Sequence, residues 1–272
     1  MSLEETRSLL RVHQIAPNKL LGQNFMVDSS FYPKLSSYAA LSAKDVVLDV
    51  GAGFGFLSLF LSPNCKQVIA VEKDPRVAEI LRQQTKGFAN ITLIVGDVLK
   101  VDVPRFNKVI SIPPYYLSSQ LVMWLLDRDL ECAVLILQKE FAERLSASLG
   151  CKEYGWIAVV AQQAMKMELL DTLPKWLFYP PPEVDSIIIR VRPLATPEFS
   201  VNNIALFRRM VKWLFAQRNK KIGNAIKNFI RCELEMDKIK AAEVASSLPF
   251  RDRRARELDP KEFGAIADAI SK

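Results

Sequence analysis

The strongest constraint on the fold is an alternation of short apolar runs with amphipathic segments that begins at residue 46. The runs have the length of buried strands, and the segments between them carry apolar residues at helical spacing. Strands are predicted at 46–50, 67–72, 90–97, 107–112 and 132–138, and helices at 56–62, 75–84 and 118–128. Apolar strands that alternate with helices pair in parallel and are buried on both faces. The pattern therefore predicts an α/β, Rossmann-like sheet covered by helices on both faces.

The chain departs from this alternation after residue 138. KEFAERLSASLG (139–150) predicts a helix that Gly150 closes. Two strand-like runs at 165–174 and 184–193 flank the segment KWLFYPPPE, whose prolines exclude an α-helix. This stiff loop is expected to be either a packed connection or a wall of a substrate pocket.

A second domain is predicted from about residue 196. LATPEFS (194–200) has the composition of a linker, and helical patterns follow it. The helices are predicted at 204–231, with a break at Gly223, and at 237–248 and 260–271. We therefore expect residues 1–195 to form the sheet domain and residues 196–272 a small helical domain, which suits a chain of 272 residues.

The first predicted strand ends in a glycine cluster, Gly51-Ala52-Gly53-Phe54-Gly55, that opens into a helix. Glycine lets the backbone turn sharply and approach a ligand closely. A dinucleotide fingerprint requires GxGxxG, whereas GxGxG is the spacing of S-adenosylmethionine (SAM) methyltransferases. Glu72 ends the second strand and Asp97 follows the third, where carboxylates can accept the ribose hydroxyls and the adenine amine. Together these residues predict a SAM crevice at the carboxyl ends of the strands.

The fourth predicted strand ends in Ser-Ile-Pro-Pro-Tyr-Tyr, at residues 111–116. Two prolines and an aromatic side chain form a rigid platform for a flat ring. Enzymes that alkylate an exocyclic amine take the base out of its stack and hold it against such a face. Tyr115 is expected to stack on the base, and the Pro113 carbonyl to accept a hydrogen bond from the amine. The alternative is that the prolines only shape a packed turn.

The positive charge of the chain is concentrated near its C-terminus. Residues 196–272 contribute +6 of the total net charge of +7. Between Phe199 and Cys232 there are eight Lys or Arg residues and no Asp or Glu, and a second cluster lies within residues 251–256. Solvated helix faces usually mix charges of both signs, so we expect this region to bind nucleic-acid phosphates.

Other function classes are disfavoured by what the sequence contains. The four cysteines (Cys65, Cys132, Cys151, Cys232) form no CxxC pair, and His13 is the single histidine, so we expect no metal site and no histidine-based catalysis. The N-terminus has no apolar run typical of a signal peptide, and no stretch approaches 18 apolar residues. We therefore expect a cytoplasmic, monomeric protein that does not interact with membranes.

The motifs together resemble the small-subunit ribosomal RNA adenine dimethyltransferase family, in particular its archaeal branch. The resemblance spans about residues 20–230 and is carried by LGQNFMVD, VLDVGAGFGFLS, VEKD, GDVL, FNKVISIPPYYLSS, LQKEFAERLSASLGCKEYG, FYPPPEVDSIIIRVRP and FAQRNKKIGNAIKN. It implies SAM-dependent methylation of exocyclic amines of adenosines near the 3′ end of small-subunit rRNA. It also implies the rRNA and the pre-ribosomal small subunit as partners.

The resemblance also implies roles for individual residues. The N-terminal segment 1–27 would close over the cofactor. The expected cofactor-binding residues are Asn24, Met26, Gly51, Glu72, Asp97, Val98 and Ile112. Pro113, Tyr115 and Phe178 would form the catalytic set, with Phe178 as an aromatic in a second substrate-facing loop. In the helical domain, Arg218, Lys220, Lys221 and Lys227 would contact RNA.

One position departs from the family pattern. The family has Asn-(Leu or Ile)-Pro-Tyr at this site, and ungapped registration places Ile112 where Asn is expected. Ile cannot accept a hydrogen bond from the target amine, and Ser111 should point to the opposite face of the strand. The loss of one aimed acceptor costs on the order of 10²–10³ in rate, by analogy with an oxyanion-hole donor. Three outcomes follow: slow dimethylation, arrest at monomethylation, or an assembly factor that binds the pre-small subunit and SAM with residual chemistry. A small-molecule SAM methyltransferase is disfavoured by the basic run.

Overall fold

The computed structural model describes residues 2–271, apart from the side chain of Lys19. The chain divides into two compact units. The first, here called the sheet unit, comprises Met1–Ala142 and Met167–Pro193. The second, the helical unit, comprises Glu143–Lys166 and Leu194–Lys272.

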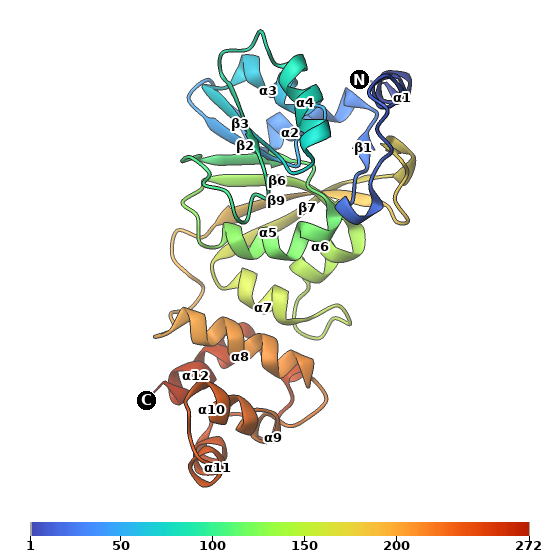
Figure 1. Ribbon diagram of the computed structural model, residues 1–272. Helices are drawn as coiled ribbons and strands as arrows, with labels where there is room; N and C mark the ends of the chain where they lie inside the picture. The colour runs from blue at the N-terminus through green and yellow to red at the C-terminus, as the bar shows by residue number, and fades with distance from the viewer. Residues whose placement is uncertain (1, 272) are drawn as a thin grey trace. The chain divides into compact units, whose positions relative to one another are not determined.

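A seven-stranded sheet forms the centre of the sheet unit (Figure 1). Its order is β4-β3-β2-β5-β6-β9-β7. The strands are β2 (Val46–Val50), β3 (Gln67–Glu72), β4 (Ile91–Val95), β5 (Lys108–Ser111), β6 (Cys132–Gln138), β7 (Met165–Leu173) and β9 (Ser186–Pro193). β2 through β6 pair in parallel, as their continuous apolar sequences predicted, whereas β9 pairs antiparallel with β6. The parallel strands therefore present their carboxyl ends at a common edge.

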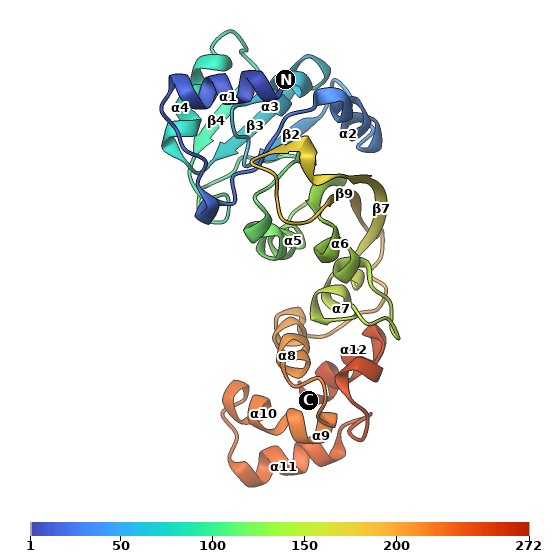
Figure 2. The same cartoon turned by 90° about the vertical axis from the view of Figure 1, so that its right-hand side faces the viewer.

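Helices cover both faces of this sheet. Figures 1 and 2 show α2 (Tyr32–Tyr38), α3 (Phe56–Leu61) and α4 (Pro75–Gln84) on one side and α5 (Ser118–Leu125) on the other. Asp74 begins α4, because its carboxylate accepts a hydrogen bond from the Arg76 amide at 3.0 Å and Pro75 follows it. The buried face of α4 carries Val77, Ala78, Ile80 and Leu81. The predicted α/β, Rossmann-like fold is confirmed.

The N-terminal segment contains a helix and a short strand that pairs with a later part of the sheet unit. Helix α1 (Leu3–Val12) begins with a capping box between Ser2 and Glu5. The chain then forms β1 (Phe25–Met26), which pairs antiparallel with β8 (Phe178–Tyr179) in a two-stranded sheet. The segment KWLFYPPPE thus contains a short strand after a 3₁₀ turn at Lys175–Leu177.

The helical unit is built from α7 (Trp156–Gln162), α8 (Ile204–Ala216), α9 (Ile222–Ala225), α10 (Lys227–Glu233), α11 (Lys238–Ser247) and α12 (Pro260–Ile270). Asn203, Asp237 and Asp259 accept backbone N–H groups at the starts of α8, α11 and α12. The core of the unit contains the aromatic rings of Phe207, Phe215, Phe229 and Phe263, all buried.

The division of the chain differs from the predicted domains in one segment. The later boundary falls between Pro193 and Leu194, close to the expected one, but residues 143–166 belong to the helical unit. The reason lies in α7, whose sequence WIAVVAQ is apolar on all sides and is buried from Ile157 to Ala161. A helix of this kind needs neighbours around its whole circumference, and α8 and α12 contact it.

Two predicted helix ends were wrong. The helix α6 (Lys139–Ser146) ends four residues before Gly150, which lies in a turn with a φ of +92°. The predicted break at Gly223 lies instead at residues 217–221, and Gly223 is inside α9. Gly223 is needed for close packing, because a Cβ there would lie 3.3 Å from the Arg251 Cβ and 3.4 Å from its carbonyl oxygen.

Candidate functional site

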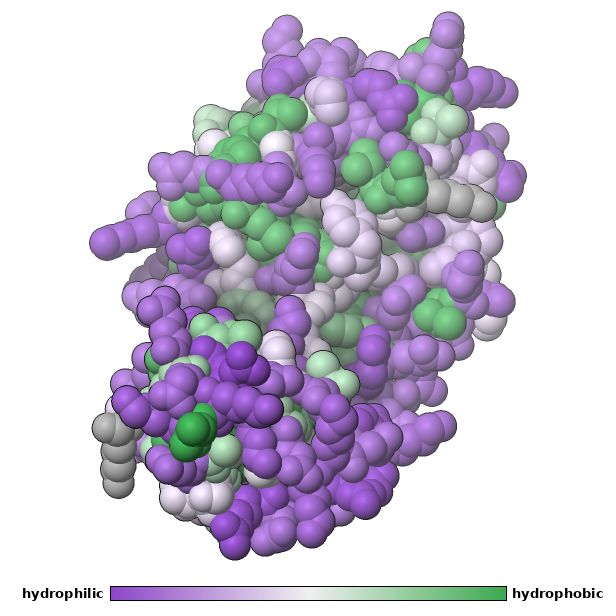
Figure 3. All heavy atoms as spheres, turned by 60° about the horizontal axis from the view of Figure 1, so that its bottom comes forward, coloured by the Kyte–Doolittle hydropathy of each residue, from purple (hydrophilic) through white to green (hydrophobic). Residues whose placement is uncertain are grey.

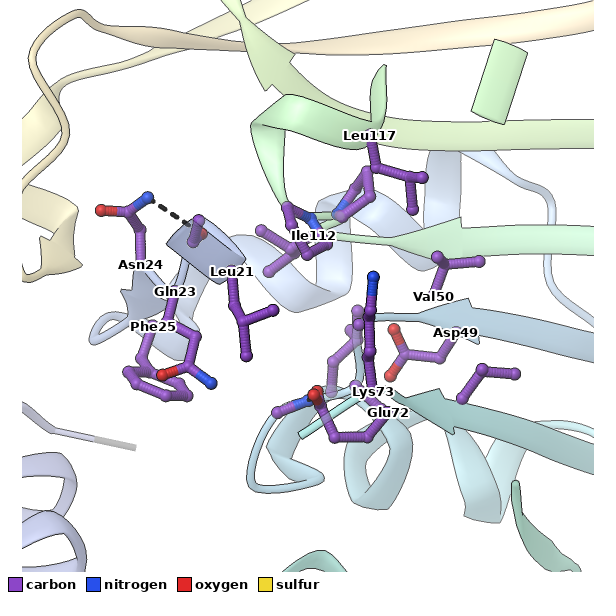
Figure 4. A pocket seen from close by; sticks show the side chains of 18 of the residues that line it. Leu21, Gln23, Asn24, Phe25, Asp49, Val50, Glu72, Lys73, Ile112 and Leu117 are labelled. Atoms are coloured by element: carbon purple, nitrogen blue, oxygen red, sulfur yellow. Dashed lines mark hydrogen bonds between the residues drawn. The ribbon is translucent and has the colours of Figure 1, made fainter. Parts of the chain in front are cut away.

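A cavity lies at the carboxyl ends of β2, β3, β4 and β5, and Figure 4 shows it closely. The loops after these strands line it on one side and the N-terminal segment lines it on the other. Nine of the ten residues predicted for cofactor binding and catalysis line this cavity: Asn24, Met26, Gly51, Glu72, Asp97, Val98, Ile112, Pro113 and Tyr115. The parallel packing of the strands brings seven of these residues together, and the N-terminal segment adds Asn24 and Met26.

The glycine loop adopts a backbone that other residues rarely adopt. Gly51, Gly53 and Gly55 have φ values of +70°, +57° and +87°. A Cβ on Gly51 would also lie 2.6 Å from the Cδ atom of Pro114. The first glycine therefore serves two purposes: it turns the chain after β2 and lets the proline platform pack directly against the loop.

Backbone amides fix the orientation of both carboxylate oxygens of Glu72. Its Oε2 accepts a hydrogen bond from the Gly53 amide at 2.9 Å, and its Oε1 accepts one from the Asp74 amide at 2.8 Å. Burial raises the pKa of this carboxyl, and the backbone hydrogen bonds partly oppose the rise. Each oxygen keeps a further lone pair, so this geometry can accept two ligand hydroxyls.

Asp97 stands at the rim of the cavity and interacts with Lys73. The Lys73 ammonium lies 3.1 Å from the Asp97 Oδ2, and the Leu99 amide donates to Oδ1 at 3.1 Å. Burial would raise the pKa of Asp97, but the Lys73 hydrogen bond and the Leu99 amide lower it overall. Lys73 also lies 5.8 Å from the ring centroid of Tyr116, so it spans the cavity mouth between the cofactor loops and the proline platform.

Asp49 is a cavity residue that the sequence analysis did not single out. It is 1% exposed, and among the described residues only the Ser58 hydroxyl bonds it, at 2.7 Å. Burial raises its pKa to about 7 and the neighbouring charge of Glu72 adds to the rise, while the Ser58 hydrogen bond opposes it. The sequence did contain a signal for this residue, since Asp49 interrupts an apolar strand of valines and leucine. Burial of a carboxyl group is costly, so a carboxyl at such a position indicates a specific role.

The charge of the cavity suits a cationic ligand. Among the described residues that line it, Asp49, Glu72 and Asp97 carry carboxyl groups and Lys73 is the only cation. SAM carries a sulfonium, so its charge complements these walls, and its ribose hydroxyls match the aimed oxygens of Glu72. The residues present therefore fit this cofactor.

Tyr115 is fixed as a platform at the cavity wall. Its hydroxyl lies 2.6 Å from the Ser186 hydroxyl, and burial raises its pKa to about 12. Phe178 contacts Tyr115 edge to face, with ring centroids 6.5 Å apart. Phe178 itself is 2% exposed and is not among the described residues that line the cavity. In this structure Phe178 therefore contacts the Tyr115 ring from outside the cavity, and its role toward the substrate stays a prediction.

The strand before this platform presents an apolar side chain to the cavity. Ile112 lines the cavity and packs against the hydrophobic core of the sheet unit. Ser111 is fully buried and uses its hydroxyl on β2, accepting from the Val50 amide at 3.1 Å and donating to the Val50 carbonyl at 2.7 Å. Ser111 therefore points away, as predicted, and does not replace the missing acceptor at position 112.

The N-terminal segment is bound to the cavity wall by polar and aromatic contacts. The Gln23 amide donates to Asp74 at 3.0 Å, and Phe25 stacks on Phe54 of the glycine loop at 4.3 Å. Asn24 donates to the Gly22 carbonyl at 3.1 Å, the bond drawn in Figure 4. Gln23 and Phe25 are further cavity residues that the sequence analysis missed, although both lie in its LGQNF motif.

The basic residues of the helical unit converge from two parts of the chain. The Ile222 and Gly223 amides donate to the carbonyls of Arg253 and Arg251 at 2.8 and 2.9 Å, which brings the 218–221 turn beside the second basic cluster. Arg218, Lys220, Lys221 and Lys227 are all polar surface residues of this unit, and Lys221 pairs with Asp252 at 3.2 Å. In the view of Figure 3 the surface of this unit is mostly hydrophilic.

The described residues include neither a candidate metal centre nor a candidate membrane-spanning helix. No group of three or more His, Cys, Asp or Glu could hold a metal ion within residues 2–271. No described helix is both long and apolar enough to cross a membrane.

Comparison with known proteins shows which family this chain belongs to. The family model for ribosomal RNA adenine dimethylase matches residues 15–253. The chain is 37% identical over 266 residues to a probable ribosomal RNA small subunit methyltransferase A of Methanosarcina mazei, covering 97% of this chain and 96% of the relative. It is 36% identical over 268 residues to the protein of the same name from Thermococcus kodakarensis, covering 97% and 94%.

Solved structures show the same fold. A dimethyladenosine transferase from Plasmodium falciparum superposes with a TM-score of 0.74 at 24% identity, covering 89% of this chain and 95% of that one. The 23S rRNA methyltransferase ErmE superposes with a TM-score of 0.63 at 24% identity, covering 92% and 100%. The chain therefore belongs to the ribosomal RNA adenine dimethylase family of SAM-dependent rRNA adenine methyltransferases.

Proposed function

We propose that the chain methylates the exocyclic amine of adenosines near the 3′ end of small-subunit rRNA, on the pre-ribosomal small subunit. One observation supports this most: the Pro113–Tyr115 platform and the Glu72–Asp97 pair surround a single cavity. A cofactor crevice that opens on an aromatic platform suits transfer to a flat base removed from its stack. The proposal extends to a monomeric protein that meets this RNA in the cytoplasm.

The cofactor residues of this proposal bind rather than react. Glu72 accepts the ribose hydroxyls, while Asp97 and Val98 flank the adenine of the cofactor. Gly51 allows close backbone approach, and Asn24 and Met26 close the cavity from the N-terminal segment. SAM supplies an electrophilic methyl group when it is bound.

The substrate residues act by orientation. Tyr115 stacks on the target adenine, and the Pro113 carbonyl accepts one amine hydrogen, which turns the nitrogen lone pair toward the methyl donor. The amine proton is acidic after methyl transfer and can leave to water, so no strong base is required. Phe178 acts through Tyr115, whose ring it holds from the edge.

Ile112 sets the expected rate of this reaction. With an apolar wall in place of an amide acceptor, only the Pro113 carbonyl orients the amine. We therefore propose that transfer is slower than in a relative with Asn at this position, with either slow dimethylation or arrest at monomethylation as the outcome.

The test is methyl transfer from labelled SAM to unmethylated small subunits, followed by nucleoside analysis. The wild-type protein should yield methylated adenosine above a Tyr115→Ala background. Ile112→Asn should raise the rate by as much as about 10²-fold and shift the product toward dimethyladenosine. Methylation at the background level in both wild type and Ile112→Asn would refute the enzymatic proposal and favour an assembly factor that only binds the particle.

A further inference from the structure

We propose that a groove between α1 and Tyr179 binds the RNA strand next to the target adenosine, as a second RNA contact within the sheet unit. The inference rests on the proposed RNA substrate. The groove has a volume of about 980 Å³ and is lined by one face of α1, residues 14–17 and Tyr179. None of these residues lines the cofactor cavity. A groove of this size can take a nucleotide.

Two arginines give the groove its charge. Arg7 and Arg11 are exposed on the face of α1 that lines it, four residues apart and therefore adjacent on the helix. Within residues 2–271 no carboxylate lies within ion-pair distance of either guanidinium, although Glu4 also lines the groove. Two cations against one anion leave guanidinium groups available for phosphate.

The groove also holds an aromatic face. The Arg7 guanidinium lies 5.0 Å from the ring centroid of Tyr179, an arrangement typical of cation–π contacts. Tyr179 is half-buried, so its ring is fixed while part of it faces the groove. Proteins that bind single-stranded RNA combine such stacking surfaces with cations that follow the backbone.

The walls of the groove are rigid. Leu10 and Ile15 are buried with Phe25 and Phe54, and Tyr179 packs against the same cluster. Ile15 donates its amide to the Leu10 carbonyl at 2.8 Å, which fixes the turn at the end of α1. Binding therefore requires little ordering of this part of the chain.

The groove is linked to the substrate platform through β8. Tyr179 pairs with Phe25, which lines the cofactor cavity, and the preceding residue Phe178 supports the Tyr115 ring. A strand whose flipped base lies on Tyr115 can therefore reach Tyr179 with a neighbouring nucleotide. This continuity favours RNA over a protein as the occupant.

The charge is tested with Arg7→Gln/Arg11→Gln, which keeps helix propensity and removes two cations. The matched control is Lys44→Gln/Lys66→Gln, two exposed cations before β2 and β3, at the opposite edge of the sheet. Binding of a single-stranded RNA of mixed sequence and of protein-free small-subunit rRNA is measured across salt concentrations. The arginine variant should bind more weakly, and its log–log salt slope should fall by about 1.4, which corresponds to two lost phosphate contacts. The control should match wild type.

The aromatic contact is tested with Tyr179→Leu and Tyr179→Phe. Loss of stacking should weaken RNA binding about 5-fold or more without changing the salt slope, and Tyr179→Phe should restore it. SAM affinity, measured by calorimetry, should be equal in all variants.

Two results would overturn the proposal. One is wild-type RNA affinity and salt slope in the arginine variant. The other is wild-type binding to free RNA with methylation lost only on the intact particle, which would assign the groove to a ribosomal protein. The binding measurements need no methyl transfer, so an inactive wild-type enzyme would refute the proposed function and leave the groove to be judged by RNA affinity alone.

Discussion

The two units of this protein differ sharply in how they carry charge. The sheet unit holds 18 Lys and Arg against 18 Asp and Glu, whereas the helical unit holds 19 against 12 and so accounts for the whole net charge of +7. In the cofactor cavity of the sheet unit the carboxyl groups are few, and those of Glu72 and Asp49 are buried. In the helical unit the basic groups are many and exposed, as at Lys220 and Lys221.

The contrast fits the ligands that we propose for the two units. A buried carboxylate that accepts directed hydrogen bonds selects one small ligand. Salt has little effect on the strength of these hydrogen bonds. Exposed cations bind a phosphate backbone of any sequence through counterion release, which salt weakens. Variants of the buried carboxylates should therefore change SAM binding without changing the salt dependence of RNA binding, and variants of the exposed cations should do the reverse.

The largest effect is expected at Tyr115. Tyr115→Ala removes the stacking face and should lower the rate of methyl transfer on the order of 10²-fold, because a misplaced amine no longer meets the methyl donor. Tyr115→Phe removes only the hydroxyl contact with Ser186 and should retain most of the rate. Single-turnover assays with labelled SAM measure both. Equal losses in the two variants would show that the hydroxyl, not the ring, matters.

The next effect is expected at Glu72. Glu72→Ala removes the acceptors for the ribose and should weaken SAM binding by about 10- to 100-fold in calorimetry, since hydrogen bonds to charged groups contribute about 1.5–3 kcal/mol. Glu79→Ala, an exposed carboxylate on α4, is the matched control. Binding of RNA should be unchanged in both. Unaltered SAM affinity in Glu72→Ala would remove this residue from the site.

A smaller effect is expected in the helical unit. Lys220→Gln/Lys221→Gln should weaken RNA binding and lower its log–log salt slope by about 1.4, with SAM affinity unchanged. Filter binding across salt concentrations measures the slope. A loss of SAM affinity in this variant would contradict the assignment of SAM binding to the sheet unit.

The smallest effect concerns pH and Asp49. The pKa of Asp49 in the folded chain is about 7, above the ordinary value for an unfolded chain, so the folded state binds the proton more tightly. The neutral carboxyl contributes stability below about pH 4, and this contribution is lost as the pH rises through 7. The melting temperature of Asp49→Asn relative to wild type should therefore rise by several degrees between pH 5 and pH 8. Parallel melting curves across this range would contradict a raised pKa.

Much of the sheet unit could be predicted from local sequence. β2, β3 and α4 have the predicted bounds, because apolar runs, an N-capping aspartate and a following proline are all local signals. The carboxyl ends of parallel strands meet at one edge, so nine of the predicted site residues could be placed together before their contacts were known. The burial of Phe178 could not be predicted, because it depends on the β1–β8 pairing, which no local pattern records.

The sequence by itself determined the alternating fold, the type of loop at Gly51 and the separation of positive charge, since each depends on residues close together in the chain. Only the tertiary structure decided the contacts that no local pattern records. It buried Asp49, directed Ser111 to Val50, placed α7 in the helical unit and brought α1 beside Tyr179. The physical reason is that burial, and with it pKa and hydrogen-bond partners, is set by neighbours distant in sequence, which become neighbours only when the chain packs.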